Sequence, residues 1–183
     1  MQCRKGCNYI MKFTDFVEIE DNMSGFEPND LISVCKRENN SKRDFLFVNK
    51  YQGKHVPARP KDIFQLFENL RVTITNDSRW NKEENVCIIG FAETATAIGQ
   101  YIAENIPNKE HYFLKTTREK LDEPLLLDFK EEHSHATEQL LYGDLQRLKK
   151  CDRILFVDDE ISTGKTILNF INELDKIKDF KYS

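Results

Sequence analysis

The stretch "RILFVDDEISTGKT", residues 153–166, decides how this chain is interpreted. After Arg153 it has four apolar residues, continues with the adjacent carboxylates Asp158 and Asp159, and ends in the letters S-T-G-K-T before a further apolar run. A short apolar run bounded by polar residues is typical of a buried strand, and the residues after the turn have the spacing of a helix. The stretch therefore predicts a strand, a polar loop and a helix in direct succession.

The letters G-K-T also end the Walker A loop of nucleoside triphosphatases. That loop requires G-x-x-x-x-G-K-[ST], and the position of its first glycine is occupied here by Asp159. A carboxylate at that position would repel a polyphosphate, and the strand leads straight into acidic residues. The spacing therefore argues against a triphosphatase.

The same letters fit a ligand that carries a diol and a phosphate monoester. The oxygens of Asp158 and Asp159 accept hydrogen bonds only, which suits two neighbouring hydroxyl groups. Hydroxyls and free backbone N–H groups at a helix N-terminus favour a phosphate. The alternative is an acidic helix cap with no ligand, which does not explain two carboxylates followed by a T-G-x-T turn. The residues expected to hold the phosphate are Ser162, Thr163, Gly164, Lys165 and Thr166.

Elsewhere, periodicity and turn residues indicate further elements. We expect strands over residues 12–20, 44–50, 85–91 and 111–118, and helices over 27–39, 60–74, 94–106, 138–149 and 164–177. Residues 119–137 form a charged stretch. This order predicts an α/β protein with a three-layer, Rossmann-like arrangement of a parallel sheet flanked by helices. Ligands of such sheets bind at the carboxyl ends of the strands, where residues 90–94, 115–118 and 157–166 lie.

The length and composition of the chain exclude several classes of protein and of partner. A chain of 183 residues is long enough for one domain, which we divide into an N-terminal extension over about 1–60 and a binding core over about 61–183. The net charge of -4 argues against a partner that is a nucleic acid. No membrane-length apolar run or apolar signal segment is present, so we expect a cytoplasmic protein without a membrane partner. Of the five cysteines, Cys87 and Cys151 are expected to be buried thiols.

The motif "ILFVDDEISTGKT" resembles the PRPP-binding motif of type I phosphoribosyltransferases, and its lysine is similar to that of the hypoxanthine-guanine enzymes. The segments "FLFVNKYQGKHVPARP", "IIGFAETATAIG", "YFLKTTRE" and "FKEEHSHATEQLL" resemble the branch of that family encoded in tellurium-resistance and stress-response gene clusters. The resemblance implies transfer of ribose 5-phosphate from PRPP, with Mg²⁺, to a base-like acceptor in nucleotide or nucleoside-like metabolism. It also implies that Asp158 and Asp159 hold the ribose hydroxyls and the metal.

The resemblance further places a pyrophosphate loop at Ala92, Glu93 and Thr94, whose backbone amides would donate. Glu93 is equally explained as an acidic residue in a helix first turn. Lys115, Thr117 and Arg118 end the next strand, and a guanidinium binds pyrophosphate bidentately. The alternative for Arg118 is a surface salt bridge.

Residues 119–137 stand where the family carries a mobile loop over the active site, which would exclude water. In this stretch Glu132 and His133 are candidate acid–base groups, and His135 would face the same way as His133 in an extended segment. A solvated charged loop is the other interpretation.

Two features depart from the family. The hypoxanthine-guanine enzymes have an aspartate where this chain has Ser162, so a 6-oxopurine acceptor is not indicated. Strands usually follow the last helix of this fold, yet the sequence ends at Ser183, so we expect the C-terminal part of the sheet to be incomplete. A homodimer or a partner that completes the sheet would cover the open edge. A PRPP- or nucleotide-sensing module without catalysis stays open as the second function.

Overall fold

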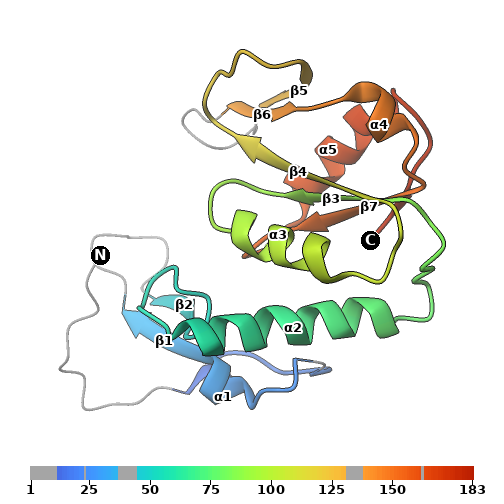
Figure 1. Cartoon of the computed structure of the whole chain (residues 1–183). Coiled ribbons are helices and arrows are strands. Elements are labelled where there is room, and N and C mark those ends of the chain that lie inside the picture. The colour runs from blue at the N-terminus through green and yellow to red at the C-terminus, as the bar shows by residue number, and fades with distance from the viewer. Residues whose placement is uncertain (1–11, 23, 37–44, 131–137, 162) are drawn as a thin grey trace. The chain divides into compact units, whose positions relative to one another are not determined.

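The computed structural model describes residues 12–22, 24–36, 45–130, 138–161 and 163–183 (Figure 1). The chain divides into two units, Met1–Asn76 and Asp77–Ser183, and each is described by itself. None of the helices in the described part of the chain is long and apolar enough to cross a membrane.

The first unit holds a two-stranded antiparallel sheet and a long helix. Its elements are η1 (Phe13–Asp15), α1 (Pro28–Leu31), β1 (Ile32–Lys36), β2 (Phe45–Asn49) and α2 (Pro60–Asn76). Ile32 lies opposite Asn49 in the sheet, and the rings of Phe13 and Phe16 pack against Phe47 and Phe45 with centroids 4.9 Å apart. The strand over 44–50 and the helix over 60–74 are confirmed.

Two predictions for this unit are wrong. Residues 12–20 contain a 3₁₀ turn in place of a strand, because the backbone N–H of Lys12 bonds to the Asp15 side chain and the segment pairs with no strand in the described part of this unit. The predicted helix over 27–39 ends after one turn at Leu31 and continues as β1. The β-branched Ile32 and Val34 favour an extended chain, and pairing with β2 satisfies the backbone.

The second unit is built on one six-stranded sheet. Its strands, in spatial order, are β5 (Leu125–Lys130), β6 (Glu138–Tyr142), β4 (His111–Thr117), β3 (Val86–Gly90), β7 (Arg153–Val157) and β8 (Lys181–Tyr182). Its helices are α3 (Thr96–Asn105), α4 (Leu145–Lys149) and α5 (Lys165–Leu174). The predicted α/β class, with helices flanking a sheet, is confirmed.

The sheet is mixed, which the sequence did not indicate. Strands β4, β3, β7 and β8 are parallel, whereas β6 runs antiparallel to both β4 and β5. Strand β5 lies inside the stretch expected to be a charged loop. The helix predicted over 138–149 is β6 followed by the short helix α4, whose N-terminus is capped by Asp144. Strand β8 was also not predicted.

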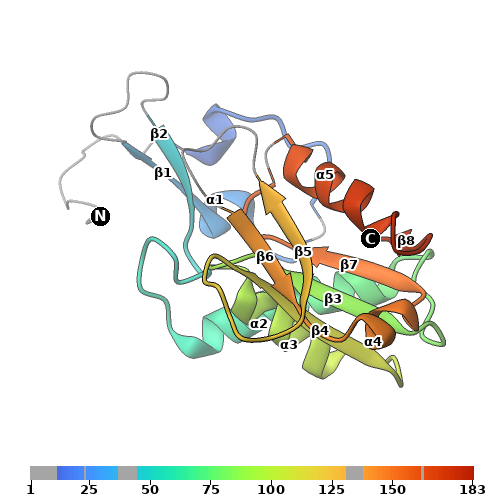
Figure 2. The ribbon, with the colours of Figure 1, turned by 90° about the horizontal axis from the view of Figure 1, so that it is seen from above.

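The core of this unit lies between the sheet and its helices. Helix α5 packs on one face, where Phe170 and Leu174 join Cys87 and Ile89, and α3 covers the other face (Figure 2). Cys87 and Cys151 are 0% and 3% exposed, as expected, and burial raises the pKa of the Cys87 thiol.

Helix α3 lies very close to the sheet at Gly99. A β-carbon built on Gly99 would lie 3.0 Å from Cε2 of Phe113 and 3.3 Å from the α-carbon of Gly90. Glycine therefore permits the approach of this helix to β3 and β4.

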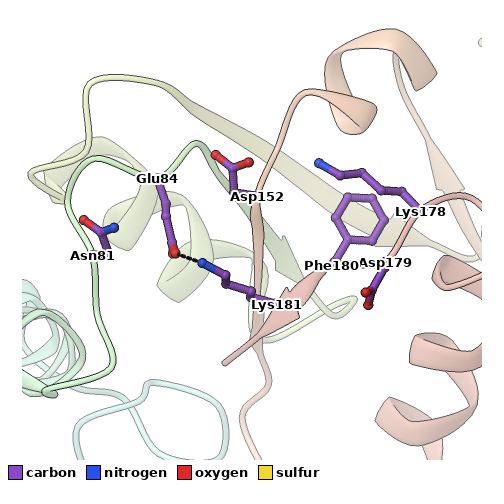
Figure 3. A pocket seen from close by; sticks show the side chains of 7 residues that line it. All are labelled: Asn81, Glu84, Asp152, Lys178, Asp179, Phe180 and Lys181. Atoms are coloured by element: carbon purple, nitrogen blue, oxygen red, sulfur yellow. Dashed lines mark hydrogen bonds and ion pairs between the residues drawn. The ribbon is translucent and has the colours of Figure 1, made fainter.

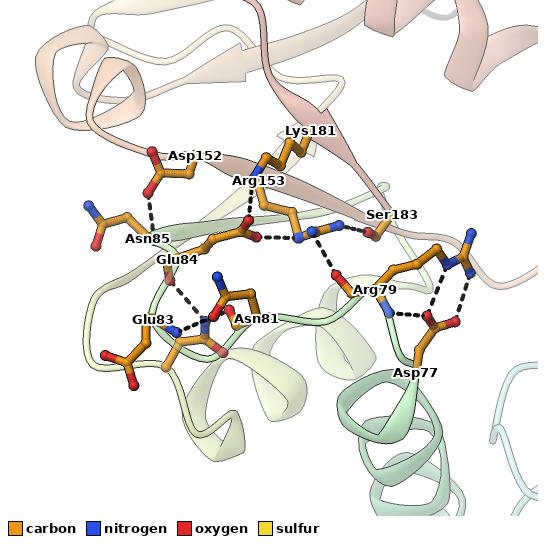
Figure 4. A network of polar contacts seen from close by, with 11 residues as sticks. Asp77, Arg79, Asn81, Glu83, Glu84, Asn85, Asp152, Arg153, Lys181 and Ser183 are labelled. Carbon is orange, nitrogen blue, oxygen red and sulfur yellow. Dashed lines mark hydrogen bonds and ion pairs between the residues drawn. The ribbon is translucent and has the colours of Figure 1, made fainter.

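A buried ionic network joins the amino ends of β3 and β7 to the C-terminal strand (Figure 4). Arg153 donates to Glu84 at 2.7 Å, to Ser183 Oγ at 2.6 Å and to the carbonyl of Arg79 at 2.9 Å. Lys181 pairs with the second carboxylate oxygen of Glu84. Burial raises the pKa of the Glu84 carboxyl, but the hydrogen bonds and charges of Lys181 and Arg153 outweigh it and place that pKa below its ordinary value.

Candidate functional site

Three of the segments singled out in the sequence meet at one edge of the second sheet. Strands β4, β3 and β7 are adjacent and parallel, and Gly90 lies opposite both Lys115 and Val157. The loops that leave these strands therefore begin at the same level, at the carboxyl edge. This placement agrees with the general position of ligands in open α/β sheets.

The two carboxylates follow β7 directly. Asp158 and Asp159 are both half-buried, and the backbone N–H of Asp159 donates to Oδ1 of Asp158 at 2.8 Å. This bond fixes the orientation of the Asp158 carboxylate relative to the strand. Neither side chain has a role in the hydrophobic core.

The turn before α5 places several donors at the start of that helix. Gly164 adopts φ 69°, a left-handed conformation, and caps the helix that begins at Lys165. Thr163 is exposed and its hydroxyl accepts weakly from the N–H of Lys165 at 3.5 Å, while Thr166 lies in the first turn. First-turn N–H groups have no acceptor within their own helix. Ser162 lies outside the described residues.

The loop between β3 and α3 is tied to the strands on both sides. Phe91 N–H donates to the carbonyl of Val157 at 3.0 Å, and Ala92 N–H donates to Oγ1 of Thr116 at 2.8 Å. The peptide bond between Ala92 and Glu93 is cis. The Ala92 amide, which the sequence interpretation named as a donor to a ligand, therefore donates to a side chain of the protein in this arrangement.

The next two amides of this loop differ from that of Ala92. Within the described part of the chain, the backbone N–H groups of Glu93 and Thr94 donate to no protein acceptor. Backbone donors in a loop that precedes a helix form a suitable anion site. The donor role expected for Glu93 and Thr94 stays a prediction.

The end of β4 contributes side chains to the same edge. Lys115 is exposed, and Thr117 is half-buried with its hydroxyl accepting from Glu119 N–H at 3.1 Å. Arg118 is 47% exposed and lies 3.9 Å from the carboxylate of Glu93. Such an exposed pair is weak, so the guanidinium stays available to a ligand.

Thr116 is a residue that the sequence interpretation did not single out. It is 1% exposed, on the strand between Lys115 and Thr117, and it holds the loop after β3. Because Leu114 and Thr116 alternate with more polar neighbours, the sequence could have indicated that the Thr116 side chain points inward. It could not have indicated the bond to Ala92, which is 24 residues away.

Strands β5 and β6 lead toward the same edge. Thr117 is paired with Leu140, and Lys130 is paired with Glu138, so the two strand ends that flank residues 131–137 extend past the carboxyl end of β4. Glu132, His133 and His135 themselves lie outside the described residues.

Two cavities occur at the opposite, amino edge of the sheet. One of about 320 Å³ is lined by Asn81, Glu84, Asp152, Lys178, Asp179, Phe180 and Lys181 (Figure 3). Most of the charged groups that line it already interact within the protein, since Lys181 pairs with Glu84 and Lys178 donates to the carbonyl of Cys151 at 2.6 Å. The other, of about 300 Å³, includes Arg147 and Cys151. Neither contains a residue that the sequence assigned to a ligand.

The carboxyl edge suits Mg²⁺ better than a metal held by protein alone. Among the residues that the structure describes, no three His, Cys, Asp or Glu side chains are grouped to hold a metal ion. Mg²⁺ is commonly bound by one or two carboxylates together with water and substrate phosphates. The carboxylates of the consecutive residues Asp158 and Asp159 fit that donor set.

Comparisons with known proteins agree with this arrangement. A family model described as phosphoribosyl transferase matches residues 31–181. A search of curated proteins finds no significant match. The chain is similar to the solved structure of adenine phosphoribosyltransferase from Rhodothermus marinus, with a TM-score of 0.55, 14% identity, and coverage of 84% of this chain and 78% of that chain.

A second solved structure gives a similar result. It is adenine phosphoribosyltransferase from Saccharomyces cerevisiae, in complex with an imino-altritol bisphosphate and adenine, at a TM-score of 0.54, 11% identity, and coverage of 83% of this chain and 81% of that chain. At such low identity the two structures support the fold. The family match covers most of the sequence, and the chain belongs to the phosphoribosyl transferase family.

Proposed function

We propose that this protein transfers the ribosyl 5-phosphate group of PRPP to a nitrogen of a base-like acceptor and releases pyrophosphate. In the step, the bond from C1 of the ribose to the pyrophosphate oxygen breaks and its electron pair leaves with pyrophosphate. A bond from C1 to the acceptor nitrogen forms, and that nitrogen loses its proton. The observation that carries the proposal is the register of β4, β3 and β7, which brings Asp158, the loop after β3 and Arg118 to one edge.

Each end of PRPP has a matching group of residues. Asp158 and Asp159 accept from the ribose hydroxyls, with Asp158 oriented by the N–H of Asp159. The turn at Thr163 and Gly164 and the first turn of α5, with Lys165 and Thr166, hold the 5-phosphate. Ser162 is proposed to join this group.

The pyrophosphate end is where charge builds as the bond breaks. The N–H groups of Glu93 and Thr94, with Arg118, Lys115 and Thr117, are proposed to hold this group. Donors fixed before the reaction stabilise a developing anion without reorganising, which lowers the barrier. The chain thus acts chiefly by positioning its substrate and stabilising the leaving group.

Mg²⁺ is proposed to be held by Asp158 and Asp159 and to neutralise charge on the pyrophosphate when bound. Glu132 and His133 are proposed as the acid–base groups that take the acceptor proton. The paired ends of β5 and β6, Lys130 and Glu138, lie past the carboxyl end of β4, which supports that assignment.

The acceptor is proposed to be a nitrogenous base. The similar yeast structure contains adenine, which makes adenine the first candidate here. The resemblance to the tellurium-resistance branch favours a nucleoside-like product made in the cytoplasm. The yeast structure and the resemblance together suggest that a panel of purines and pyrimidines should be tested as acceptors.

The test is binding of PRPP with Mg²⁺ by isothermal titration, followed by a pyrophosphate-release assay across that panel. The double variant Asp158→Asn, Asp159→Asn is expected to lose at least about 100-fold in PRPP affinity, because two charge-assisted hydrogen bonds, each worth about 1.5–3 kcal/mol, are weakened. Its thermal melt should remain cooperative, since neither residue belongs to the core.

A matched control is Asp152→Asn, which changes the same residue type at the amino end of β7. It should leave PRPP affinity within twofold. Binding of ATP but not PRPP would overturn the proposal, as would unchanged PRPP affinity in the double variant. Binding of PRPP without release of pyrophosphate for any base would support a sensing module instead.

A further inference from the structure

Thr116 is a buried hydroxyl whose position connects two parts of the site. It is 1% exposed and lies near the carboxyl end of β4, where it pairs with Leu141 of β6. Its neighbour Lys115 lies opposite Gly90, the last residue of β3. It shares a face of the strand with Leu114, a core residue. Valine has nearly the same shape and would fill this place without a polar group, so the packing alone does not require a hydroxyl.

The hydroxyl is used to hold the loop after β3. Oγ1 of Thr116 accepts the N–H of Ala92 at 2.8 Å, next to the bond from Phe91 N–H to the Val157 carbonyl at 3.0 Å. The Phe91 bond joins two backbones and is independent of side-chain identity. The Thr116 bond, in contrast, depends on a side chain, and at 2.8 Å it is closer than the exposed 3.9 Å ion pair between Glu93 and Arg118.

The bond between Ala92 and Thr116 affects the two backbone amides that follow Ala92 in the loop. Ala92 N–H is fixed by Thr116, and the next two N–H groups, of Glu93 and Thr94, donate to no acceptor among the described residues. The orientation of the Ala92 peptide determines where those donors point, because the chain between them has few free torsions. Loss of the tether would leave a half-buried N–H unsatisfied and let the loop turn.

We propose that Thr116 is a positioning residue that holds the Ala92 amide and thereby directs the N–H groups of Glu93 and Thr94 at the pyrophosphate group of PRPP. The proposal rests on the proposed function. Thr116 itself does not touch the ligand. Its effect is therefore expected on pyrophosphate binding and not on the other end of PRPP.

The experiment compares Thr116→Val with Thr116→Ser by titration with pyrophosphate, ribose 5-phosphate and PRPP, each with Mg²⁺. The valine variant is expected to bind pyrophosphate and PRPP about tenfold more weakly, which corresponds to the loss of about one hydrogen bond. It should bind ribose 5-phosphate within twofold of wild type. The serine variant, which keeps the hydroxyl, should restore pyrophosphate binding to within threefold.

The matched control is Thr75→Val, which removes a hydroxyl that donates to the Arg71 carbonyl at 3.0 Å in α2. It should change none of the three affinities by more than twofold. If the valine variant does not melt cooperatively, Thr116→Ala provides the same comparison.

The outcomes separate the two proposals. Wild type that binds neither PRPP nor pyrophosphate overturns the proposed function together with this inference. Wild type that binds PRPP, with a valine variant that binds pyrophosphate equally well, overturns the role of Thr116 alone. If the valine variant binds pyrophosphate and ribose 5-phosphate more weakly by the same factor, Thr116 has a purely structural role.

Discussion

Glu93 and Arg118 illustrate how one residue pair at the site carries opposing charges. The carboxylate is 80% exposed and lies 3.9 Å from the guanidinium, within the group proposed to meet pyrophosphate. An anion that approaches this loop meets a repelling carboxylate and an attracting guanidinium. Among the residues assigned to the pyrophosphate group, Glu93 is therefore the one whose charge opposes binding of an anion.

We expect Glu93→Gln to tighten PRPP binding about threefold. The variant removes a negative charge next to the pyrophosphate and releases Arg118 from an exposed pair worth at most about 1 kcal/mol. Titration with PRPP at low and high salt is the measurement, and the gain should shrink at high salt because exposed charges are screened.

Glu104→Gln, at the other end of α3, is the control and should leave the affinity unchanged. If Glu93→Gln instead binds PRPP more weakly, the carboxylate serves the metal, and the repulsion argument is wrong.

At the scale of single elements, the start of α5 depends on one backbone conformation. Gly164 has φ 69°, and a β-carbon there would meet nothing within 4 Å. A side chain at this position therefore has room, and its cost lies in the left-handed backbone itself. For a residue with a β-carbon this cost is about 1–2 kcal/mol.

Gly164→Ala is accordingly expected to lower the free energy of unfolding by about 1 kcal/mol and to weaken ribose 5-phosphate binding, because relaxation of the turn moves the donors of Thr163 and Lys165. Chemical denaturation and titration measure the two effects. Gly164→Asn should lose less stability, since asparagine tolerates this conformation better. An alanine variant that equals wild type in both measurements would contradict the argument.

The helix predicted over residues 138–149 shows how hydrophobic periodicity can give a wrong secondary structure. Residues 138–149 have apolar residues at Leu140, Leu141, Leu145 and Leu148, a spacing compatible with a helix, yet the first part is β6. Hydrogen bonds from β4 and β5 decide this outcome, and the apolar spacing of residues 138–149 carries no information about these partners. Strands β3, β4 and β7 were predicted correctly because continuous apolar runs identify buried parallel strands without knowledge of their partners.

At the scale of the whole second unit, the Glu84–Arg153–Lys181 network ties three distant segments together. Glu84 and Arg153 are 7% and 8% exposed, and the network includes Ser183. The pKa of Glu84 lies below its ordinary value, so the folded state favours the ionised carboxylate. Stability from this group is therefore present above the unfolded pKa of about 4.3 and is lost as the pH falls through the lower folded pKa.

We expect Glu84→Gln to lower the free energy of unfolding at pH 7 by about 3 kcal/mol, because Arg153 would stay buried without its charged partner. Below pH 4.3 wild type should lose stability more steeply than the variant, since the variant has no carboxylate to protonate there. Urea denaturation at a series of pH values measures both.

The control is Glu173→Gln, which breaks an exposed pair with Lys176 and should cost less than about 1 kcal/mol. Parallel stability curves for wild type and Glu84→Gln between pH 3 and 5 would count against the network.

The local sequence determined the strand–loop–helix units of the second unit and the residues at their ends, including Asp158, Asp159 and Gly164. Apolar runs, helical spacing and turn residues act between near neighbours, so they can be recognised in the sequence itself. The tertiary structure decided the mixed sheet, the strand identity of β1 and β6, and the bond between Ala92 and Thr116. Those features depend on hydrogen bonds between separate segments of the chain, which form only when the segments lie side by side.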